Sequence, residues 1–182
     1  GCYSFQEEEE LEFFIKKNNL IPTKIINTHC HIDHVLGNSF VTEKWKIPLY
    51  IHELELPILE NAKEISSLYG FEEYKVSPYP NRFLKKGDTI TFGESKLEVL
   101  FTPGHSPGHI CLYSYEEGFL IAGDVIFQGS IGRTDLLGGN YEVLINSIKS
   151  EIIHMKNNTK IFCGHGPSTI LEYEKNNNPF LK

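Results

Sequence analysis

The segment of residues 28–34, which reads T-H-C-H-I-D-H, constrains this chain more than any other stretch. It follows residues 24–27, where two adjacent isoleucines downstream of Pro22 predict a short buried strand. Three imidazoles and one carboxylate stand within six positions at the end of that strand. A polar loop with solvated histidines is the plainer interpretation, but so many ligand-type side chains favour a metal site.

The alternation of an extended backbone divides this segment into two parts. His29 and His31 are two positions apart, so they point to the same side and can bind one metal ion. Asp33 and His34 are adjacent and do not follow the alternation. They suit a chain that turns into a helix, and they can serve a second metal ion. We expect Cys30, between the histidines, to point to the opposite side rather than to act as a third ligand.

Size and charge narrow the class of protein. A chain of 182 residues is long enough for one domain with a sizeable core, and we expect a single domain over residues 1–182. A net charge of −7 argues against a nucleic-acid partner, whose phosphates need a basic face. No stretch approaches the roughly 18 apolar residues of a membrane span, and the acidic residues 1–12 are unlike a secretory signal.

The cysteines indicate the compartment. They form no C-x-x-C pair, and their spacing is too irregular for a disulfide framework in a chain of this length: Cys2, Cys30, Cys111 and Cys163. We expect reduced thiols in a cytoplasmic protein that binds neither nucleic acid nor membrane.

Helical and extended patterns alternate along the chain. We expect helices over residues 7–17, 37–46, 56–69, 140–155 and 168–175. We expect strands over residues 24–27, 49–52, 89–92, 97–101, 110–115, 119–122 and 160–163. Asn140 should cap its helix, and Thr169 and Glu172 have the spacing of a capping box. One face of the helix after Asn140 should be apolar, with Leu144, Ile148 and Ile152.

Three further loops share one pattern, a histidine or aspartate beside glycine after a predicted strand. They read T-P-G-H-S-P-G-H at residues 102–109, G-D at 123–124 and G-H-G-P at 164–167. Strand ends present side chains to a common cleft, and glycine lets the backbone approach a metal closely. These loops add His105, Asp124 and His165 to the ligand candidates.

Sorted by chemistry, the candidates divide into two sets that share one residue. The first metal ion would take His29, His31 and His105, and the second would take Asp33, His34 and His165. Asp124 would bridge both ions, because a carboxylate has two oxygens. Three nitrogens at one site and a mixed set at the other suit zinc, iron or manganese, with zinc our first expectation.

The remaining histidines are weaker candidates. His109 lies at the head of a strand, and we expect it to pack in the core or to support a ligand rather than bind metal. His52 and His154 have no ligand-like context. Residues 71–82, a loop with two prolines, are either the rim of a substrate cleft or a plain connector.

The motifs T-H-C-H-I-D-H, T-P-G-H-S-P-G-H, G-D and G-H-G-P-S-T resemble the metallo-β-lactamase fold superfamily of hydrolases. G-R-T-D at residues 132–135 and the ending E-K-N-N-N-P-F-L resemble its small glyoxalase II-like branch. The resemblance runs along nearly the whole chain. It implies an α/β fold, an αββα sandwich with two mixed sheets between helices and the metal ions at one edge.

Two features differ from the glyoxalase II pattern. In that family a strand hairpin with a D-P-G turn precedes the first helix. Gly1 falls at the position of that glycine, so about two strands are expected to be missing from this chain. Full-length glyoxalase II also carries a C-terminal helical domain that helps to bind glutathione, and this sequence stops before it. The resemblance therefore leaves the thiol of the substrate open.

The resemblance also implies substrate contacts. Arg133 lies where glyoxalase II has a basic residue that contacts substrate, and it would grip a carboxylate or an amide. An ion pair with Asp135 is the structural alternative. Asp135 itself replaces a tyrosine of glyoxalase II, which argues against a glutathione site. Tyr141 either lines the cleft or packs at the start of its helix.

A dinuclear site predicts a hydrolase. Water between two cations about 3.5–4 Å apart loses a proton near neutral pH, so a bridging hydroxide would be the nucleophile. The substrate carbonyl would face the first metal ion, and Asp33 and Asp124 would be the catalytic carboxylates. A thiolate with a pKa of about 8.5 leaves without a general acid. We therefore expect hydrolysis of a small-molecule thioester, an S-acyl thiol such as lactoylglutathione.

Other functions stay open. A persulfide dioxygenase is similar to this branch but uses one iron ion held by two histidines and one aspartate, which would leave the second ligand set idle. A lactonase or a β-lactamase is a further hydrolase alternative. An inactive metal-binding module is the alternative outside the enzymes, although the complete ligand set argues against it. The sequence does not decide the oligomeric state, and a homo-oligomer is open.

Overall fold

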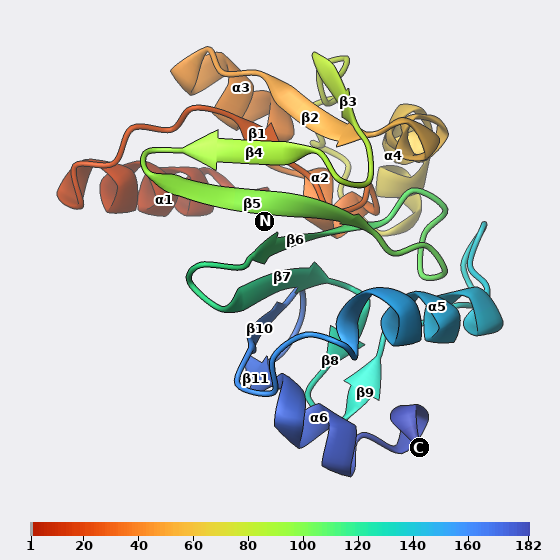
Figure 1. Ribbon diagram of the computed structural model, residues 1–182. Coiled ribbons are helices and arrows are strands. Elements are labelled where there is room, and N and C mark those ends of the chain that lie inside the picture. The colour runs from red at the N-terminus through yellow and green to blue at the C-terminus, as the bar shows by residue number, and fades with distance from the viewer. Residues whose placement is uncertain (1) are drawn as a thin grey trace. The chain divides into compact units, whose positions relative to one another are not determined.

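The computed structural model describes residues 2–182 (Figure 1). Gly1 lies outside the described residues, and so does the expectation that it occupies the glycine position of the D-P-G turn. The chain forms two compact units, which meet in sequence between Phe83 and Leu84. Among residues 2–182, no helix combines the length and the apolar character that crossing a bilayer requires.

The first unit contains a small sheet and the red to yellow helices of Figure 1. Its strand order is β1-β2-β3, with β1 (Ile25–Ile26), β2 (Leu49–His52) and β3 (Arg82–Leu84), which ends one residue beyond the boundary. Its helices are α1 (Phe5–Lys17), α2 (Ile32–Val35), α3 (Asn38–Trp45), the 3₁₀-helix η1 (Glu53–Glu55) and α4 (Leu56–Leu68).

The strands β1 and β2 run parallel, with Ile25 opposite Leu49. Parallel neighbours need a crossover, and α2 and α3 supply it, so residues 28–34 lie where the chain leaves the carboxyl end of β1. The predicted strand is present, but the prediction that it is buried is wrong. Ile25 and Ile26 are only half-buried, because β1 is an edge strand with one neighbour.

The second unit contains a six-stranded sheet of order β11-β10-β7-β6-β5-β4. The strands are β4 (Thr89–Phe92), β5 (Ser95–Phe101), β6 (Ile110–Ser114), β7 (Phe119–Gly123), β10 (Lys160–Cys163) and β11 (Thr169–Ile170). A separate hairpin joins β8 (Ile126–Phe127) to β9 (Ser130–Ile131). The helices are α5 (Tyr141–Ser147), the π-helix η2 (Ile148–Ile152), α6 (Leu171–Asn177) and the 3₁₀-helix η3 (Pro179–Leu181).

The directions of these strands bring three loops to one edge of the sheet. β5 and β7 each pair antiparallel to β6, so they run the same way, and β10 pairs parallel to β7. The carboxyl ends of β5, β7 and β10 therefore share an edge. The loops that leave those ends carry His105, Asp124 and His165.

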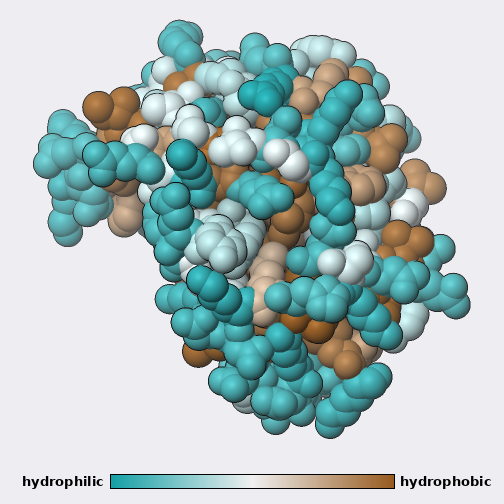
Figure 2. All heavy atoms as spheres, in the orientation of Figure 1, coloured by the Kyte–Doolittle hydropathy of each residue, from teal (hydrophilic) through white to brown (hydrophobic). Residues whose placement is uncertain are grey.

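Each unit buries its own apolar cluster. In the first unit the cluster includes Cys30, Val35, Leu49 and Ile51, all fully buried. In the second unit the sheet packs against the helical segment after Asn140, and the predicted face is confirmed, since Leu144, Ile148 and Ile152 are all 0% exposed. The surface seen in Figure 2 is mostly hydrophilic, with apolar residues in small scattered groups.

The helix predicted over residues 140–155 is shorter as an α-helix. Asn140 caps it as expected, because its Oδ1 accepts a hydrogen bond from the Val143 backbone N–H at 3.1 Å. The α-helical pattern ends at Ser147, and the next turn is the π-helix. The apolar face continues through both, which is why the spacing alone predicted a single helix.

The predicted capping box near the C-terminus is wrong. Thr169 and Ile170 form β11, paired antiparallel to β10, and α6 begins only at Leu171. The N-cap of α6 makes no side-chain hydrogen bond. The Thr169 hydroxyl instead donates to Glu174 Oε1 at 2.6 Å, so a partner one helical turn away satisfies it.

Candidate metal centre

The ligand candidates of the first unit lie on the turn from β1 into α2. His31 is the N-cap of α2, with φ −62° and ψ 152°, so the backbone changes from extended to helical directly after it. Asp33 and His34 follow in that short helix. The change of backbone geometry places the adjacent pair as the sequence predicted, outside the alternation of an extended strand.

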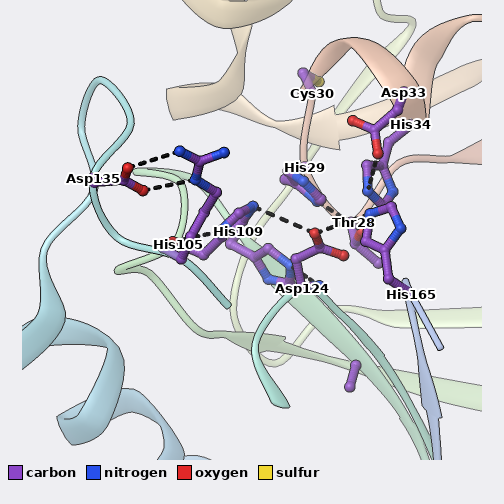
Figure 3. Close-up of polar contacts among 12 residues, drawn as sticks. Thr28, His29, Cys30, Asp33, His34, His105, His109, Asp124, Asp135 and His165 are labelled. Atoms are coloured by element: carbon purple, nitrogen blue, oxygen red, sulfur yellow. Dashed lines mark hydrogen bonds and ion pairs between the residues drawn. The ribbon is translucent and has the colours of Figure 1, made fainter. Parts of the chain in front are cut away.

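These four side chains converge within the first unit. Ligand atoms of His29 and His31 lie within 4.8 Å of each other, and so do those of His29 and His34. His34 Nε2 lies 3.4 Å from Asp33 Oδ2, as the dashed line in Figure 3 shows. His29 is fully buried, whereas the Asp33 side chain keeps 44% of its surface exposed. One buried imidazole and more accessible partners fit a metal centre at the margin of a folded unit.

Cys30 packs in an apolar cluster rather than with this set. The residue is 0% exposed and packs in the apolar cluster of the first unit, as expected for a side chain opposite the histidines. Burial raises the pKa of the Cys30 thiol well above its ordinary value, so the thiolate that metals prefer is disfavoured. The Cys30 backbone N–H donates to Oε2 of the buried Glu55 at 2.7 Å.

The candidates of the second unit converge on one carboxylate. Asp124 Oδ2 lies 3.7 Å from His105 Nε2 and 3.3 Å from His165 Nε2 (Figure 3). His105 and Asp124 are buried, while the His165 side chain is 56% exposed. The common edge of the sheet thus brings one carboxylate oxygen next to two histidine nitrogens.

The protonation of His105 suits a ligand. Its Nδ1 lies 2.7 Å from the carbonyl oxygen of Arg133. A carbonyl only accepts, so Nδ1 carries the proton, and in the neutral ring Nε2 keeps its lone pair on the side of Asp124. Such backbone partners commonly fix the orientation of metal-binding histidines.

Two glycines leave room that no other residue would leave. A Cβ atom at Gly164 would lie 2.1 Å from Asp124 Oδ1, and one at Gly132 would lie 1.8 Å from the Asp124 carbonyl oxygen. The sequence interpretation, that glycine permits close approach at these loops, is therefore supported for Asp124. Within each unit the nitrogen and oxygen donors, their distances and this clearance fit a divalent metal ion.

The family follows from comparison with known proteins. Residues 3–165 match the family model described as the metallo-beta-lactamase superfamily.

The chain belongs to the metallo-β-lactamase superfamily.

Curated relatives agree with this assignment. The chain is 42% identical over 178 residues to the probable metallo-hydrolase YqgX of Bacillus subtilis (strain 168), an alignment that covers 96% of this chain and 83% of the relative. It is 33% identical over 180 residues to hydroxyacylglutathione hydrolase GloC of Haemophilus influenzae (strain ATCC 51907 / DSM 11121 / KW20 / Rd), again covering 96% and 83%. The predicted likeness to the glyoxalase II-like branch is thereby confirmed.

Solved structures confirm the predicted metallo-β-lactamase fold. TTHA1623 in a di-iron-bound form matches with a TM-score of 0.88 and 38% identity, over 95% of this chain and 84% of that chain. The BLEG-1 B3 metallo-β-lactamase matches with a TM-score of 0.88 and 36% identity, over 96% and 84%. This member of the metallo-β-lactamase superfamily is therefore a metallo-hydrolase with residues suited to divalent metal.

The substrate-contact candidates of this metallo-hydrolase lie in the second unit. Arg133 Nε and Nη2 donate to the two carboxylate oxygens of Asp135, each at 2.7 Å, so the ion pair predicted as the alternative is present. Both side chains are more than half exposed. Tyr141 is the first residue of α5 and is 49% exposed. Contact of Arg133 or Tyr141 with substrate stays a prediction.

Two supporting residues stand out beside the ligands. His109 is fully buried, as expected for a core histidine, and its Nε2 accepts a hydrogen bond from the Asp124 backbone N–H at 3.0 Å. Glu55 was not predicted. It lies 25 residues from its partner Cys30, and no local pattern marks an acid that will be buried by the fold. The available signal is its place at the end of η1, directly before the start of α4.

Proposed function

We propose that this metallo-hydrolase cleaves thioesters of small molecules and uses two divalent metal ions, with zinc first and iron or manganese as alternatives. The ligands would be His29, His31 and His105 for one ion, Asp33, His34 and His165 for the other, and Asp124 for both. When bound, the two ions would lower the pKa of a water molecule and polarise the substrate carbonyl. The observation that carries the proposal is Asp124 Oδ2 between His105 Nε2 and His165 Nε2.

The chain's own residues would divide the remaining work. Asp33 is exposed enough to accept a hydrogen bond from the attacking water and so to orient it. Asp124 is buried, so its charge faces the reacting atoms with little screening by solvent. Arg133 would release Asp135 to hold a carboxylate of the substrate.

The nature of the leaving group supports a thioester. A thiolate leaves at a pKa of about 8.5, whereas an alkoxide or an amide anion needs a proton. Of the motif residues left outside the ligand set, His109 is buried against the Asp124 backbone and Asp135 pairs with Arg133, so neither has an obvious claim to be a general acid, and a reaction without one suits this chain. The name of the relative GloC, a hydroxyacylglutathione hydrolase, supports the same class of substrate.

A matched series tests the proposal: one acyl group on a thiol, an alcohol and an amine, assayed with metal-loaded protein. We expect the thioester to be cleaved at least about 100-fold faster than the ester or the amide. Arg133→Ala should raise KM for thioesters that bear a carboxylate more than for neutral ones. Equal rates across the series would reject the thioester assignment.

Hydrolysis of a β-lactam is the second candidate, because the structure is similar to that of the BLEG-1 B3 metallo-β-lactamase over 96% of the chain. A β-lactam included in the series decides between the two. A kcat/KM for the β-lactam above that for the thioester would replace the proposed function and leave the ligand assignment in place. His154→Ala, which changes an exposed histidine outside the ligand set, is the matched control.

A further inference from the structure

A buried chain of hydrogen bonds leads from the Asp124 backbone into the sheet of the second unit. The Asp124 N–H donates to His109 Nε2 at 3.0 Å, and His109 Nδ1 lies 3.1 Å from Thr102 Oγ1. Thr102 Oγ1 lies 3.3 Å from Cys111 Sγ, which in turn lies 3.4 Å from the carbonyl oxygen of Ala122. All five residues are buried. The series of hydrogen bonds begins at Asp124, just after β7, and ends within β7 at Ala122.

The groups at the two ends of this hydrogen-bond series determine which atom donates at each end. A backbone N–H can only donate, so His109 Nε2 carries no proton, and the neutral ring must hold it on Nδ1. Nδ1 therefore donates to Thr102. At the far end the Ala122 carbonyl can only accept, so the Cys111 thiol donates to it. Burial raises the pKa of Cys111 to about 12, which keeps the proton of that thiol in place.

The same histidine also closes the loop that carries His105. The His109 carbonyl accepts from the Thr102 N–H at 2.9 Å, and the His109 N–H donates to the Ser106 carbonyl at 3.4 Å. Residues 102–109 are thus tied at their base by the residue whose ring holds Asp124. Figure 3 shows His105, His109 and Asp124 close together. One residue, through its backbone on one side and its ring on the other, thereby connects two ligand candidates that belong to different loops.

We propose that His109 is a positioning residue: its Nδ1-protonated ring fixes the Asp124 backbone and so directs the Asp124 carboxylate toward metal. This inference rests on the proposed function, in which Asp124 is a metal ligand. His109 itself does not touch the metal. Removing its bond to the Asp124 N–H frees the first residue after β7 to rotate, and the carboxylate then loses its fixed direction.

Two substitutions of similar size separate positioning from packing. In His109→Gln the amide oxygen reaches the position of Nε2 and can accept from the Asp124 N–H. In His109→Asn the shorter side chain reaches only the position of Nδ1 and leaves that N–H without its acceptor. We expect His109→Asn to bind zinc 10- to 100-fold more weakly than the native chain, and His109→Gln to recover most of this loss.

The measurements are a zinc titration against a chromophoric chelator and nitrogen NMR shifts of His109 in metal-free protein. The shifts should report the Nδ1-protonated form. An Nε2-protonated ring, or equal zinc affinity in the two variants, would overturn the proposal. If His109→Asn does not fold, Thr102→Val takes its place, since it removes the acceptor of Nδ1–H, together with the contacts of that hydroxyl to Cys111 Sγ and the His109 carbonyl, and leaves the His109 ring present. It should raise the Nε2-protonated fraction and weaken zinc binding, and an unchanged ring and affinity would also overturn the proposal.

Asp124→Ala distinguishes this inference from the proposed function. If Asp124→Ala lowers zinc binding while His109→Asn does not, only the positioning role fails. If Asp124→Ala leaves zinc binding unchanged, Asp124 is no ligand, and the metal assignment beneath both proposals fails.

Discussion

At the scale of single residues, the site depends on what each side chain contacts within its own unit. The His109 ring accepts a hydrogen bond from the Asp124 backbone. Gly164, which has no Cβ atom, leaves room for the Asp124 carboxylate. His165 is more exposed than His105 although both face the same oxygen. These differences predict unequal effects when the residues are changed.

Removing Asp124 should cost both metal ions. Asp124→Ala deletes the proposed bridge and leaves two close cations that repel each other, so we expect the bound metal to fall to well below one equivalent. His165→Ala removes one ligand of one ion and should leave about one equivalent. Metal analysis of protein purified under metal-replete conditions checks both values. Native protein that never exceeds one equivalent would contradict the dinuclear assignment.

The pair of Arg133 and Asp135 predicts a titration. The hydrogen bond from Arg133 lowers the pKa of Asp135 from its ordinary value of 3.8 to about 2. A depressed pKa means that the pair is fully formed above the ordinary value and is lost as pH falls through about 2. Carboxyl carbon shifts of Asp135 should follow this midpoint, and Arg133→Ala should raise it toward the ordinary value of 3.8. A midpoint that the substitution leaves unchanged would remove Arg133 as the cause.

At the scale of elements, the loop that carries His105 depends on α5. The Gly104 carbonyl accepts from the Asn140 N–H at 2.7 Å, and the Ser147 hydroxyl donates to the Pro103 carbonyl at 2.7 Å. The two ends of the helix thus contact the same part of the loop, its first residues Pro103 and Gly104. The π-helix directly after Ser147 keeps the apolar face buried while the hydrogen-bond pattern changes.

Gly104 is the position where this contact is most sensitive. Its φ is +128°, and a Cβ atom there would lie 2.3 Å from the Leu144 backbone nitrogen. We expect Gly104→Ala to lower the free energy of unfolding by at least about 3 kcal/mol, since backbone strain and a backbone clash add. Gly87→Ala is the control, because its φ is +84° with open space around the Cβ, and it should cost only about 1 kcal/mol. Urea unfolding compares them, and equal costs would refute the close packing.

At the scale of the whole molecule, the proposed ligand set takes residues from both units. Metal that binds only the folded chain stabilises it by mass action, by about 2.7 kcal/mol at a free concentration 100 times Kd. We therefore expect zinc to raise the midpoint of thermal unfolding and a chelator to lower it. Hydrogen exchange should slow in both units when zinc is added. Protection confined to one unit would contradict the assignment of ligands from both units to each ion.

Much of the fold could be predicted because its longer elements carry a local period. β2, β4 and β10 have the predicted bounds, and α4 ends at Leu68, one residue before the predicted end. The short strands β3, β8, β9 and β11 were missed, since two or three residues are too few to show alternation. Such strands form because a neighbour supplies hydrogen bonds, and that neighbour is known only after folding.

The same division holds for the site. The sequence by itself determined the types of the candidate ligands, because imidazoles and carboxylates beside glycine at strand ends are a local property of the chain. Only the tertiary structure decided how they are held. Strand direction put three loops at one edge of a sheet, and burial turned His109 and Glu55 into acceptors of backbone N–H groups far away in sequence. Those contacts depend on which surfaces exclude water together, and no spacing along the chain encodes that.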